Sequence, residues 1–221
     1  MSERIRVLSV LNKLYRGGHD NRLLTLARLI DKSNFDHRIV TVTSEPVRTE
    51  DEQRAVGSLR PEFADHGMLV HDLGIAESNG ESAGVNRTWK AANELRRAVR
   101  QLVKYIREHQ IDVVDAHHTI AMIAARMASA ITGGPLFHSS YHIAPWKRRF
   151  MTLLGKMTLG GADAIVTDSR FRGQEISQWL GAKAPPIHVI PTGLDIPIPT
   201  RSADEVRNEL GLPNDPNLKI V

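Results

Sequence analysis

The sequence has 221 residues, of which 41% are hydrophobic and 24% charged; this composition is ordinary for a globular protein and excludes general disorder. The chain has no cysteine, which excludes disulfides, thiolate catalysis and cysteine-ligated zinc. Its formal net charge of +4 favours an anionic partner, such as a phosphorylated substrate, a nucleic acid or an anionic membrane surface.

The chain opens with "MSERIRVLSVL", which carries one acid, two arginines and an apolar run of strand length. We interpret this segment as a first β-strand over residues 5–11 and not as a signal peptide. No apolar run in the sequence approaches the roughly 18 residues that a membrane-spanning helix needs.

Short apolar runs then alternate with stretches of helical period. Consecutive apolar residues are typical of strands buried on both faces of a parallel sheet. They predict strands at 5–11, 38–43, 68–72, 113–116, 136–140, 164–167 and 187–190, and the helical period predicts helices around 23–30, 89–106, 120–131, 146–159 and 170–180. This alternation predicts an α/β fold with right-handed crossovers and a doubly wound, mostly parallel, Rossmann-like sheet.

Two stretches interrupt the alternation. Residues 45–66 are highly charged, and residues 74–86 are rich in Gly, Ser and Asn. We expect both to be surface loops on the ligand side of the sheet, although a solvated linker explains each equally well. At the end of the chain, a proline-spaced linker precedes a short helix with Ser202 as N-cap and the first residues of a strand at 219–221. We therefore expect one complete domain over 1–195, and at 196–221 a linker with the truncated start of a second domain.

A glycine pair, Gly17 and Gly18, lies between the first strand and the first helix. Its spacing is neither the dinucleotide fingerprint G-x-G-x-x-G nor the Walker pattern. Glycines that lead into a helix leave free backbone N–H groups at its positive end, which is a ready anion site. The alternative is a simple turn whose helix start is stabilised by Asp20, and the local sequence slightly favours this turn.

Four histidines lie at or beyond the ends of predicted strands. His117 and His118 follow the fourth strand, His138 lies within the fifth and His142 lies just beyond it. Because ligands bind at the carboxyl ends of strands in an open parallel sheet, His117 and His142 are expected to converge near the glycine pair. The alternative is that these histidines only bond loop backbone, which we prefer for His138.

Other chemistries receive little support. The sequence has no H-E-x-x-H pattern and no carboxylate close to the histidines except Asp115, so no metal site is expected. Ser169 follows a strand but is not in a G-x-S-x-G elbow. Aromatic residues make up only 5% of the chain and no recognition motif is present, so nucleic acid is not an expected partner.

The predicted helix at 146–157 is basic and amphipathic. A helix of this kind can lie on an anionic membrane, whereas the commoner alternative is a surface helix packed on its own sheet. Its apolar face contains Trp146, Phe150, Leu153, Leu154 and Met157, and its cations are Lys147, Arg148, Arg149 and Lys156.

Taken in order, these segments resemble the amino-terminal domain of retaining glycosyltransferases with the GT-B fold, in the glycosyltransferase 4-like family. Five segments carry the resemblance: "RIRVLSVLNKLYRGGHDNRLLTLARLI", "IDVVDAHHTIAMIAARMA", "PLFHSSYHIAP", "GADAIVTDSRFRGQEI" and "VIPTGLD". Together they span essentially the whole chain. The chain departs from the family pattern at His19-Asp20-Asn21, at Asp115 and at Thr192.

The resemblance implies two Rossmann-like domains with the active site between them. The amino-terminal domain would mostly bind the acceptor, which is a glycan, a lipid or a small molecule, and the carboxy-terminal domain the nucleotide-sugar donor. No metal or other cofactor is implied. By resemblance, the catalytic residue is His142, the donor diphosphate or sugar lies against Gly17 and Gly18, the acceptor side includes Asn12, His117, His118 and Ser169, and the interdomain hinge includes Pro191, Gly193 and Asp195.

The resemblance further implies transfer of a hexose with retention, by a cytoplasmic enzyme. Contact with the inner membrane face through residues 146–157 is a further expectation. The family's residues that neutralise the leaving diphosphate belong to the carboxy-terminal domain, so this chain alone is expected to be a poor catalyst without a longer parent or a partner chain. One alternative is a non-catalytic nucleotide- or glycan-binding module derived from such an enzyme. Another is an NAD-dependent Rossmann enzyme, which the missing fingerprint disfavours.

Overall fold

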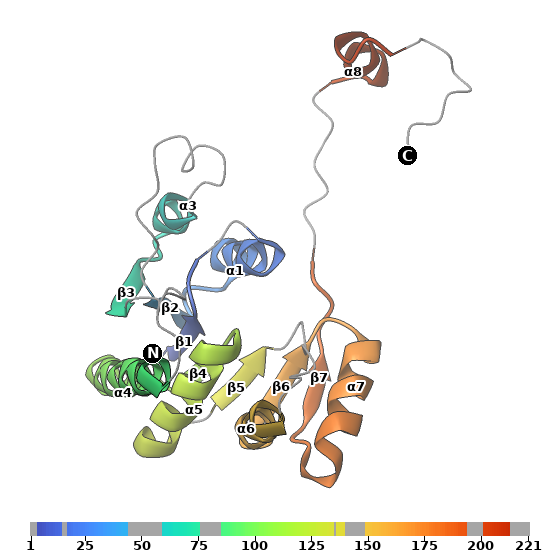
Figure 1. The fold of residues 1–221 in the computed structure, drawn as a ribbon. Helices are drawn as coiled ribbons and strands as arrows, with labels where there is room; N and C mark the ends of the chain where they lie inside the picture. The colour runs from blue at the N-terminus through green and yellow to red at the C-terminus, as the bar shows by residue number, and fades with distance from the viewer. Residues whose placement is uncertain are drawn as a thin grey trace.

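The computed structural model describes residues 4–14, 17–43, 59–75, 85–134, 136–139, 149–193 and 201–212. Within these residues, seven strands form a single sheet whose neighbouring strands all run parallel, in the order β3-β2-β1-β4-β5-β6-β7 (Figure 1). The strands are β1 Ile5–Leu11, β2 Phe35–Thr43, β3 Val70–Ile75, β4 Val113–Ala116, β5 Leu136–Ser139, β6 Ala164–Thr167 and β7 Ile187–Val189. The helices are α1 Gly18–Leu29, α3 Arg60–Asp65, α4 Val85–Glu108, α5 Thr119–Thr132, α6 Arg149–Leu159, α7 Arg170–Leu180, the 3-10 helix Gly181–Lys183 and α8 Ala203–Glu209.

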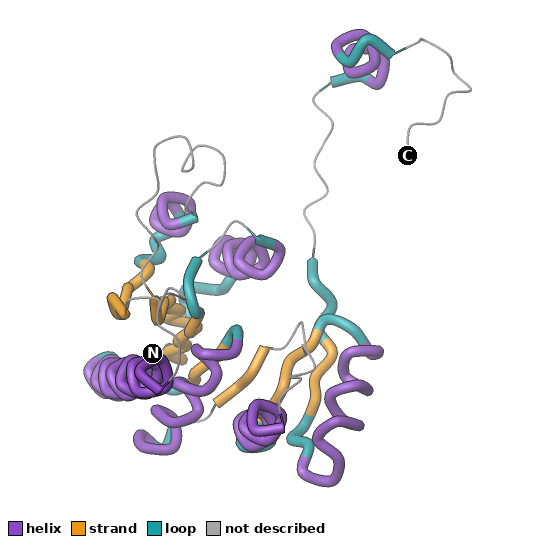
Figure 2. The backbone as a smooth tube through the Cα atoms, viewed as in Figure 1, coloured by secondary structure: helices purple, strands orange, loops and turns teal. Residues whose placement is uncertain are grey.

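Helices cover both faces of the sheet, with α1 and α3 on one face and α4, α5, α6 and α7 on the other (Figures 1 and 2). The strand period of two explains how β1 serves both layers. Leu8 and Val10 belong to the larger core with α4 and α5, whereas Leu11 packs with Leu23 and Phe63 under α1 and α3. The predicted doubly wound α/β architecture is therefore confirmed.

The predicted strands at 5–11, 113–116 and 164–167 have the bounds that the structure shows. The loop predicted at 45–66 is wrong in its last part, because residues 60–65 form the helix α3. This short helix has a proline in its first turn, and Leu59 and Phe63, one helical turn apart, are both fully buried. These two anchors hold a helix inside an otherwise charged stretch. The loop predicted at 74–86 is likewise shortened, since β3 extends to Ile75 and α4 begins at Val85.

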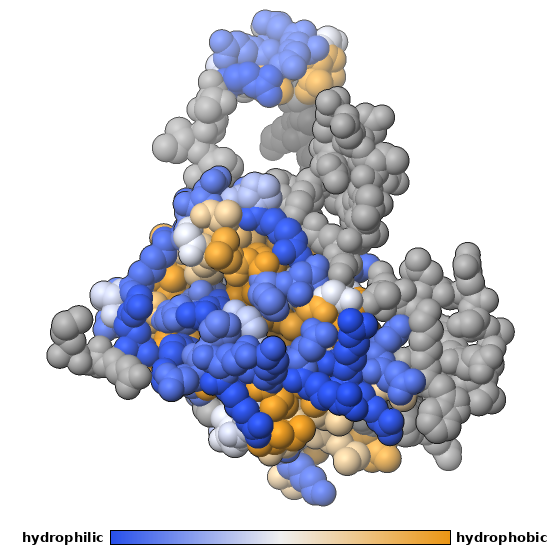
Figure 3. Space-filling model, turned by 90° about the vertical axis from the view of Figure 1, so that its left-hand side faces the viewer, coloured by the Kyte–Doolittle hydropathy of each residue, from blue (hydrophilic) through white to orange (hydrophobic). Residues whose placement is uncertain are grey.

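The chain's cations are concentrated on α4. This helix buries Val99, Leu102 and Ile106 against the sheet. Figure 3 faces this side of the molecule and shows strongly hydrophilic residues along it. The exposed cations of α4 are Arg96, Arg97, Arg100, Lys104 and Arg107.

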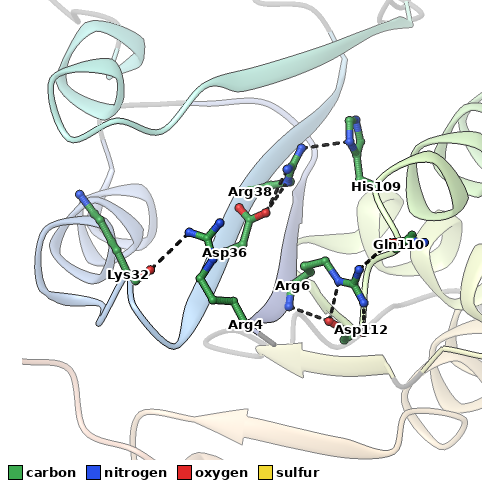
Figure 4. Close-up of polar contacts among 8 residues, drawn as sticks. All are labelled: Arg4, Arg6, Lys32, Asp36, Arg38, His109, Gln110 and Asp112. Carbon is green, nitrogen blue, oxygen red and sulfur yellow. Dashed lines mark hydrogen bonds and ion pairs between the residues drawn. The ribbon is translucent and has the colours of Figure 1, made fainter. Parts of the chain in front are cut away.

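A second polar group ties together the amino ends of the strands, far from the ligand end of the sheet (Figure 4). Arg6 of β1 donates from Nε and Nη2 to the two carboxylate oxygens of Asp112, each at 2.9 Å, and from Nη1 to Gln110 at 2.7 Å. Arg6 holds the pKa of Asp112 below its usual value. Arg38 similarly donates to Asp36 and to Nδ1 of His109. Arg6 thus joins β1 to the residue before β4, and Arg38 joins β2 to the residue after α4, so their role is structural.

The predicted helix after the linker is confirmed as α8. Ser202 and Glu205 form a reciprocal capping box at its start. The strand start predicted at 219–221 and the domain boundary predicted at 195/196 lie outside the described residues, so that division stays a prediction. None of the helices that the structure describes is long and apolar enough to cross a bilayer.

Candidate functional site

The strand order reverses direction between β1 and β4. The chain leaves β1 through α1 toward β2, on one side, and leaves β4 through α5 toward β5, on the other. In doubly wound sheets the crevice for ligands opens at this switch point, outside the carboxyl ends of the two strands. The residues that follow these ends are Asn12 and the glycine pair after β1, and His117 and His118 after β4.

The glycine pair begins α1. Gly17 is the N-cap, with extended backbone (φ −122°, ψ 169°) and no side-chain cap, and Gly18 is the first helical residue. Among the described residues, nothing requires a glycine at either position. Of these residues, a Cβ on Gly17 would meet only Asp20 Oδ2, at an ordinary 3.6 Å, and a Cβ on Gly18 would meet none within 4 Å. The first-turn N–H groups of a helix have no intrahelical acceptor, so this end of α1 carries positive charge.

Asn12 joins three elements beneath the same edge. Its backbone oxygen accepts both the N–H and the hydroxyl of Thr43, each at 2.8 Å, which ties the end of β1 to β2. Its side-chain oxygen accepts the N–H of Ala121 at 2.7 Å. Because Ala121 lies in the first turn of α5, Asn12 supplies a cap that α5 does not obtain from its own sequence.

The two histidines after β4 differ in their surroundings. His117 is 2% exposed, its backbone N–H donates to Val10, and its Nε2 lies 2.8 Å from Asp115 Oδ2. His118 is exposed and is the N-cap of α5, with φ 70° and ψ 163°. Backbone of this kind is strained for any residue except glycine, and such strain clusters at functional sites. Desolvation and the neighbouring His117 lower the pKa of His118 to about 4.

A line of polar side chains runs under α1 from β2 to the glycine pair, and we call it the polar chain. His37 Nε2 lies 2.8 Å from Ser9 Oγ, and Ser9 is paired in register with Asp115, the partner of His117. His117 in turn interacts electrostatically with Asp20, in the first turn of α1. The polar chain therefore crosses β2, β1 and β4 and ends at the start of α1.

Burial shifts two pKa values within the polar chain in opposite senses. Desolvation raises the pKa of Asp20 from 3.8 to about 6, although the charge of His117 opposes this shift. Desolvation lowers the pKa of His37 from 6.5 to about 4. Asp20 Oδ1 and His37 Nδ1 are buried and have no hydrogen-bond partner among the residues described. Sequence reasoning missed Ser9 and His37; polar residues on one face of otherwise apolar strands were the signal.

Of the remaining predicted site residues, Ser169, Pro191 and Gly193 have described positions. Ser169 follows β6, and its hydroxyl accepts the N–H of Arg172 as the N-cap of α7. Pro191 and Gly193 are exposed beyond β7, and Arg22 of α1 donates to the adjacent Thr192 at 3.5 Å. The side chain of His138, and the whole of His142 and Asp195, lie outside the described residues.

Metal ligands do not gather in this part of the molecule. Among the residues with described positions, no three histidine or carboxylate side chains lie together in a way that holds a metal ion.

Of the predicted site residues, the structure brings five together at one edge of the sheet: Asn12, Gly17, Gly18, His117 and His118.

Comparison with solved structures shows the same architecture. Anabaena HepE in complex with UDP and glucose matches 94% of this chain and 50% of its own, with a TM-score of 0.64 and 17% identity. Sucrose-phosphate synthase from Thermosynechococcus elongatus matches 96% of this chain and 54% of its own, with a TM-score of 0.65 and 12% identity. At these identities the likeness concerns the fold.

Comparison of sequences identifies the family. EpsF of Bacillus subtilis (strain 168), assigned as a glycosyltransferase, is 23% identical over 225 residues, which cover 97% of this chain and 52% of EpsF. The chain thus spans about half the length of the relatives that it matches. The sequence profile of Glycosyltransferase Family 4 matches residues 16–197. The chain belongs to Glycosyltransferase Family 4.

Proposed function

We propose that this chain forms the acceptor side of a retaining glycosyltransferase that transfers a hexose from a nucleotide-sugar to a glycan, a lipid or a small-molecule acceptor. In this proposal, the backbone of Gly17 and Gly18 lies against the diphosphate or the sugar of the donor. The donor domain is supplied by a further part of the protein or by a partner chain. In this proposal the groups that stabilise the leaving diphosphate belong to that domain, so the chain is a poor catalyst without it.

The observation that carries the proposal is the space around the glycine pair. Neither position has a left-handed backbone, and no described residue would clash with a Cβ at either one. The described part of the fold therefore does not account for two successive glycines here. A ligand that approaches the backbone closely does account for them, and the positive helix end favours a negatively charged one.

The other proposed roles rest on position at the same edge for the described residues, and on the family resemblance for His142. Asn12, His117 and His118 supply the acceptor side in this proposal, and Ser169 supplies it from the end of β6. His142 stabilises the charge that develops on the transferred sugar, so it is the proposed catalytic residue. No metal takes part, since electrostatic stabilisation comes from helix ends and side chains.

The hinge proposed at Pro191, Gly193 and Asp195 leads toward the donor domain. The bond from Arg22 to Thr192 supports it, because it ties α1 to the segment that leaves β7. A donor domain connected there would be held near the start of α1.

We place the enzyme in the cytoplasm, with α6 as a contact for the inner membrane face. Leu153 and Met157 support this part of the proposal, because they are 58% and 66% exposed beside the exposed Lys156. Sedimentation with phosphatidylglycerol vesicles tests it. We expect the wild type to sediment with the vesicles and a Leu153→Glu, Met157→Glu variant to remain in the supernatant. Equal sedimentation of both proteins would contradict the contact.

Substitution at the glycine pair tests the central proposal. Calorimetry with UDP-glucose compares the wild type with Gly18→Ala and with Gly134→Ala, a matched control between α5 and β5. A Cβ on Gly134 would meet only the Thr132 hydroxyl, at 3.8 Å. We expect Gly18→Ala to lose binding while it unfolds no earlier than the wild type, since alanine favours the helix by up to about 1 kcal/mol. Unchanged affinity in Gly18→Ala would contradict the proposal.

A further inference from the structure

The positive charge of the protein is concentrated in one layer of helices. The helices α4, α5 and α6, which cover one face of the sheet, contain ten lysines and arginines but only two acids, Glu94 and Glu108. The whole chain has 29 such cations and 25 acids, so the remainder of the chain is net negative. The exposed side of these three helices, here called the α4–α6 face, therefore carries the charge that favours an anionic partner.

The cations of α4 form a row. Arg96, Arg100 and Lys104 follow one another at intervals of four residues and are all exposed, with the exposed Arg97 beside them. Like charges four residues apart destabilise a helix. Lys104 pairs with Glu108 at 3.6 Å, whereas no described residue pairs with Arg96, Arg97 or Arg100. The row thus opposes folding, and the described part of the chain does not neutralise it.

The two neighbouring helices expose apolar side chains. Met127 and Ile131 of α5 are 43% and 55% exposed, and Leu153 and Met157 of α6 are also exposed. The members of each pair are four residues apart, so each pair forms a ridge along its helix. Because the three helices bury their inner sides in one core against the sheet, the ridges and the row of α4 both face away from it. Figure 3 shows hydrophobic residues on the surface next to the hydrophilic row.

A further cation lies where α5 meets the end of α6. The Arg126 guanidinium packs so closely on the backbone of Gly161 that a Cβ at this glycine would clash with it. Arg126 is half-buried, and no described residue forms a hydrogen bond or an ion pair with it. A partly desolvated cation without a partner is unfavourable, so this position favours an anion that comes from outside the described fold.

A bilayer with anionic headgroups matches all of these features. Its phosphates attract the cations, and the boundary between headgroups and acyl chains accepts the apolar ridges. A nucleic acid or an acidic protein would match the cations alone. A second copy of the chain would place the same positive face against itself, because a two-fold interface uses one surface patch from both subunits.

We infer that the α4–α6 face lies on an anionic phospholipid surface, with the row of α4 on the headgroups, Met127 and Ile131 at the acyl boundary, and Arg126 on a lipid phosphate. The inference deepens the membrane contact proposed for α6 and rests on that part of the proposed function. The whole helix layer, and not α6 by itself, meets the bilayer.

The experiment measures partitioning of the 221-residue chain onto phosphatidylglycerol vesicles by sedimentation at rising lipid concentration, with phosphatidylcholine vesicles as the neutral comparison. The variant Arg96→Gln, Arg100→Gln removes two charges from the row. Its matched control is Arg28→Gln, Lys32→Gln, which removes two exposed charges, also four residues apart, at the end of α1 on the opposite face of the sheet.

We expect the arginine variant to partition about twentyfold more weakly, since each cation near an anionic surface contributes about fivefold. It should melt no earlier than the wild type, because a like-charge pair is gone. The control should partition like the wild type, since charges more than about 10 Å from the lipid are screened. Met127→Gln, Ile131→Gln, which keeps every charge, should lower partitioning by about tenfold. Phosphatidylcholine vesicles should bind the wild type weakly.

Each remaining outcome would overturn the inference. Equal losses in the arginine variant and its control would assign the binding to net charge. A loss in the arginine variant with none in Met127→Gln, Ile131→Gln would mean that any acidic surface suffices. A wild-type dimer in the absence of vesicles, dissociated by Met127→Gln, Ile131→Gln, would assign the α5 ridge to a second copy.

The same assay separates this inference from the proposed function. Unchanged partitioning of the arginine variant, together with a loss in Leu153→Glu, Met157→Glu, would overturn the inference and leave the contact through α6. No binding of the wild type to phosphatidylglycerol vesicles would overturn both membrane contacts. It would leave the proposed glycosyltransferase function, which calorimetry with UDP-glucose tests without lipid.

Discussion

The pH dependence of folding provides a sharp test of the buried carboxylate. Burial raises the pKa of Asp20 to about 6 in the folded chain, from an ordinary value of 3.8. Between these two values the folded state keeps a proton that the unfolded state has released. Stability that this proton provides is present at low pH and is lost as pH rises through the folded pKa. A shift of this size, at about 1.4 kcal/mol per unit, corresponds to about 3 kcal/mol.

His37 has the opposite effect over almost the same range. Its pKa falls from 6.5 to about 4 on folding, so the unfolded state binds the extra proton between these values. The contribution of His37 is present above pH 6.5 and is lost as pH falls to 4, again by about 3 kcal/mol. The two contributions offset each other in the wild type. The contribution of Asp20 is therefore visible only as a difference between variants.

Urea unfolding of the wild type and Asp20→Asn, at intervals from pH 4 to pH 7, measures that difference. We expect the unfolding free energy of Asp20→Asn to rise by about 3 kcal/mol relative to that of the wild type as the pH goes from 4 to 7. The reason is that asparagine carries no charge to desolvate. Asp65→Asn is the control variant at an exposed carboxylate. A constant difference between Asp20→Asn and the wild type would refute the reasoning about the buried charge.

Three further predictions concern the same edge and the same urea measurement. His37→Gln should lose about 3 kcal/mol of unfolding free energy relative to the wild type between pH 4 and pH 7, and a constant difference from the wild type would show that another group titrates. Asn12→Ala should cost about 1 kcal/mol because the Ala121 N–H loses its acceptor, whereas Asn12→Asp should keep the cap; equal losses would assign the cost elsewhere. His118→Gly should stabilise the chain by about 1 kcal/mol by relieving the backbone at φ 70°, and a loss of stability would argue against strain there.

The fold could be predicted because each element carries its own signal. Apolar runs such as 164–167 are bounded by turns, and α7 begins directly after Ser169, a strong N-cap. The helix α3 could not be predicted in the same way, since its burial depends on Leu59 and Phe63 meeting a surface that only the folded sheet provides. Local pattern does not contain that surface.

The site could be predicted in part, for a similar reason. The glycine pair and the histidines follow strands, and the rule for parallel sheets brings the ends of those strands together. The burial of Asp20 could not be predicted. The sequence suggested an acid that stabilises the start of α1, and the structure places it in that first turn, where its carboxylate is buried and its pKa is raised. That burial arises from contacts between residues that are far apart in the sequence.

The central claim is that a nucleotide-sugar lies against the backbone of Gly17 and Gly18. The most direct measurement is a titration of the ¹⁵N-labelled chain with UDP-glucose, in which the amide resonances are followed residue by residue. The account predicts saturable shifts at Gly17, Gly18 and His118, with no change along the amino ends of the strands near Arg6. Saturable shifts confined to other parts of the chain would contradict it.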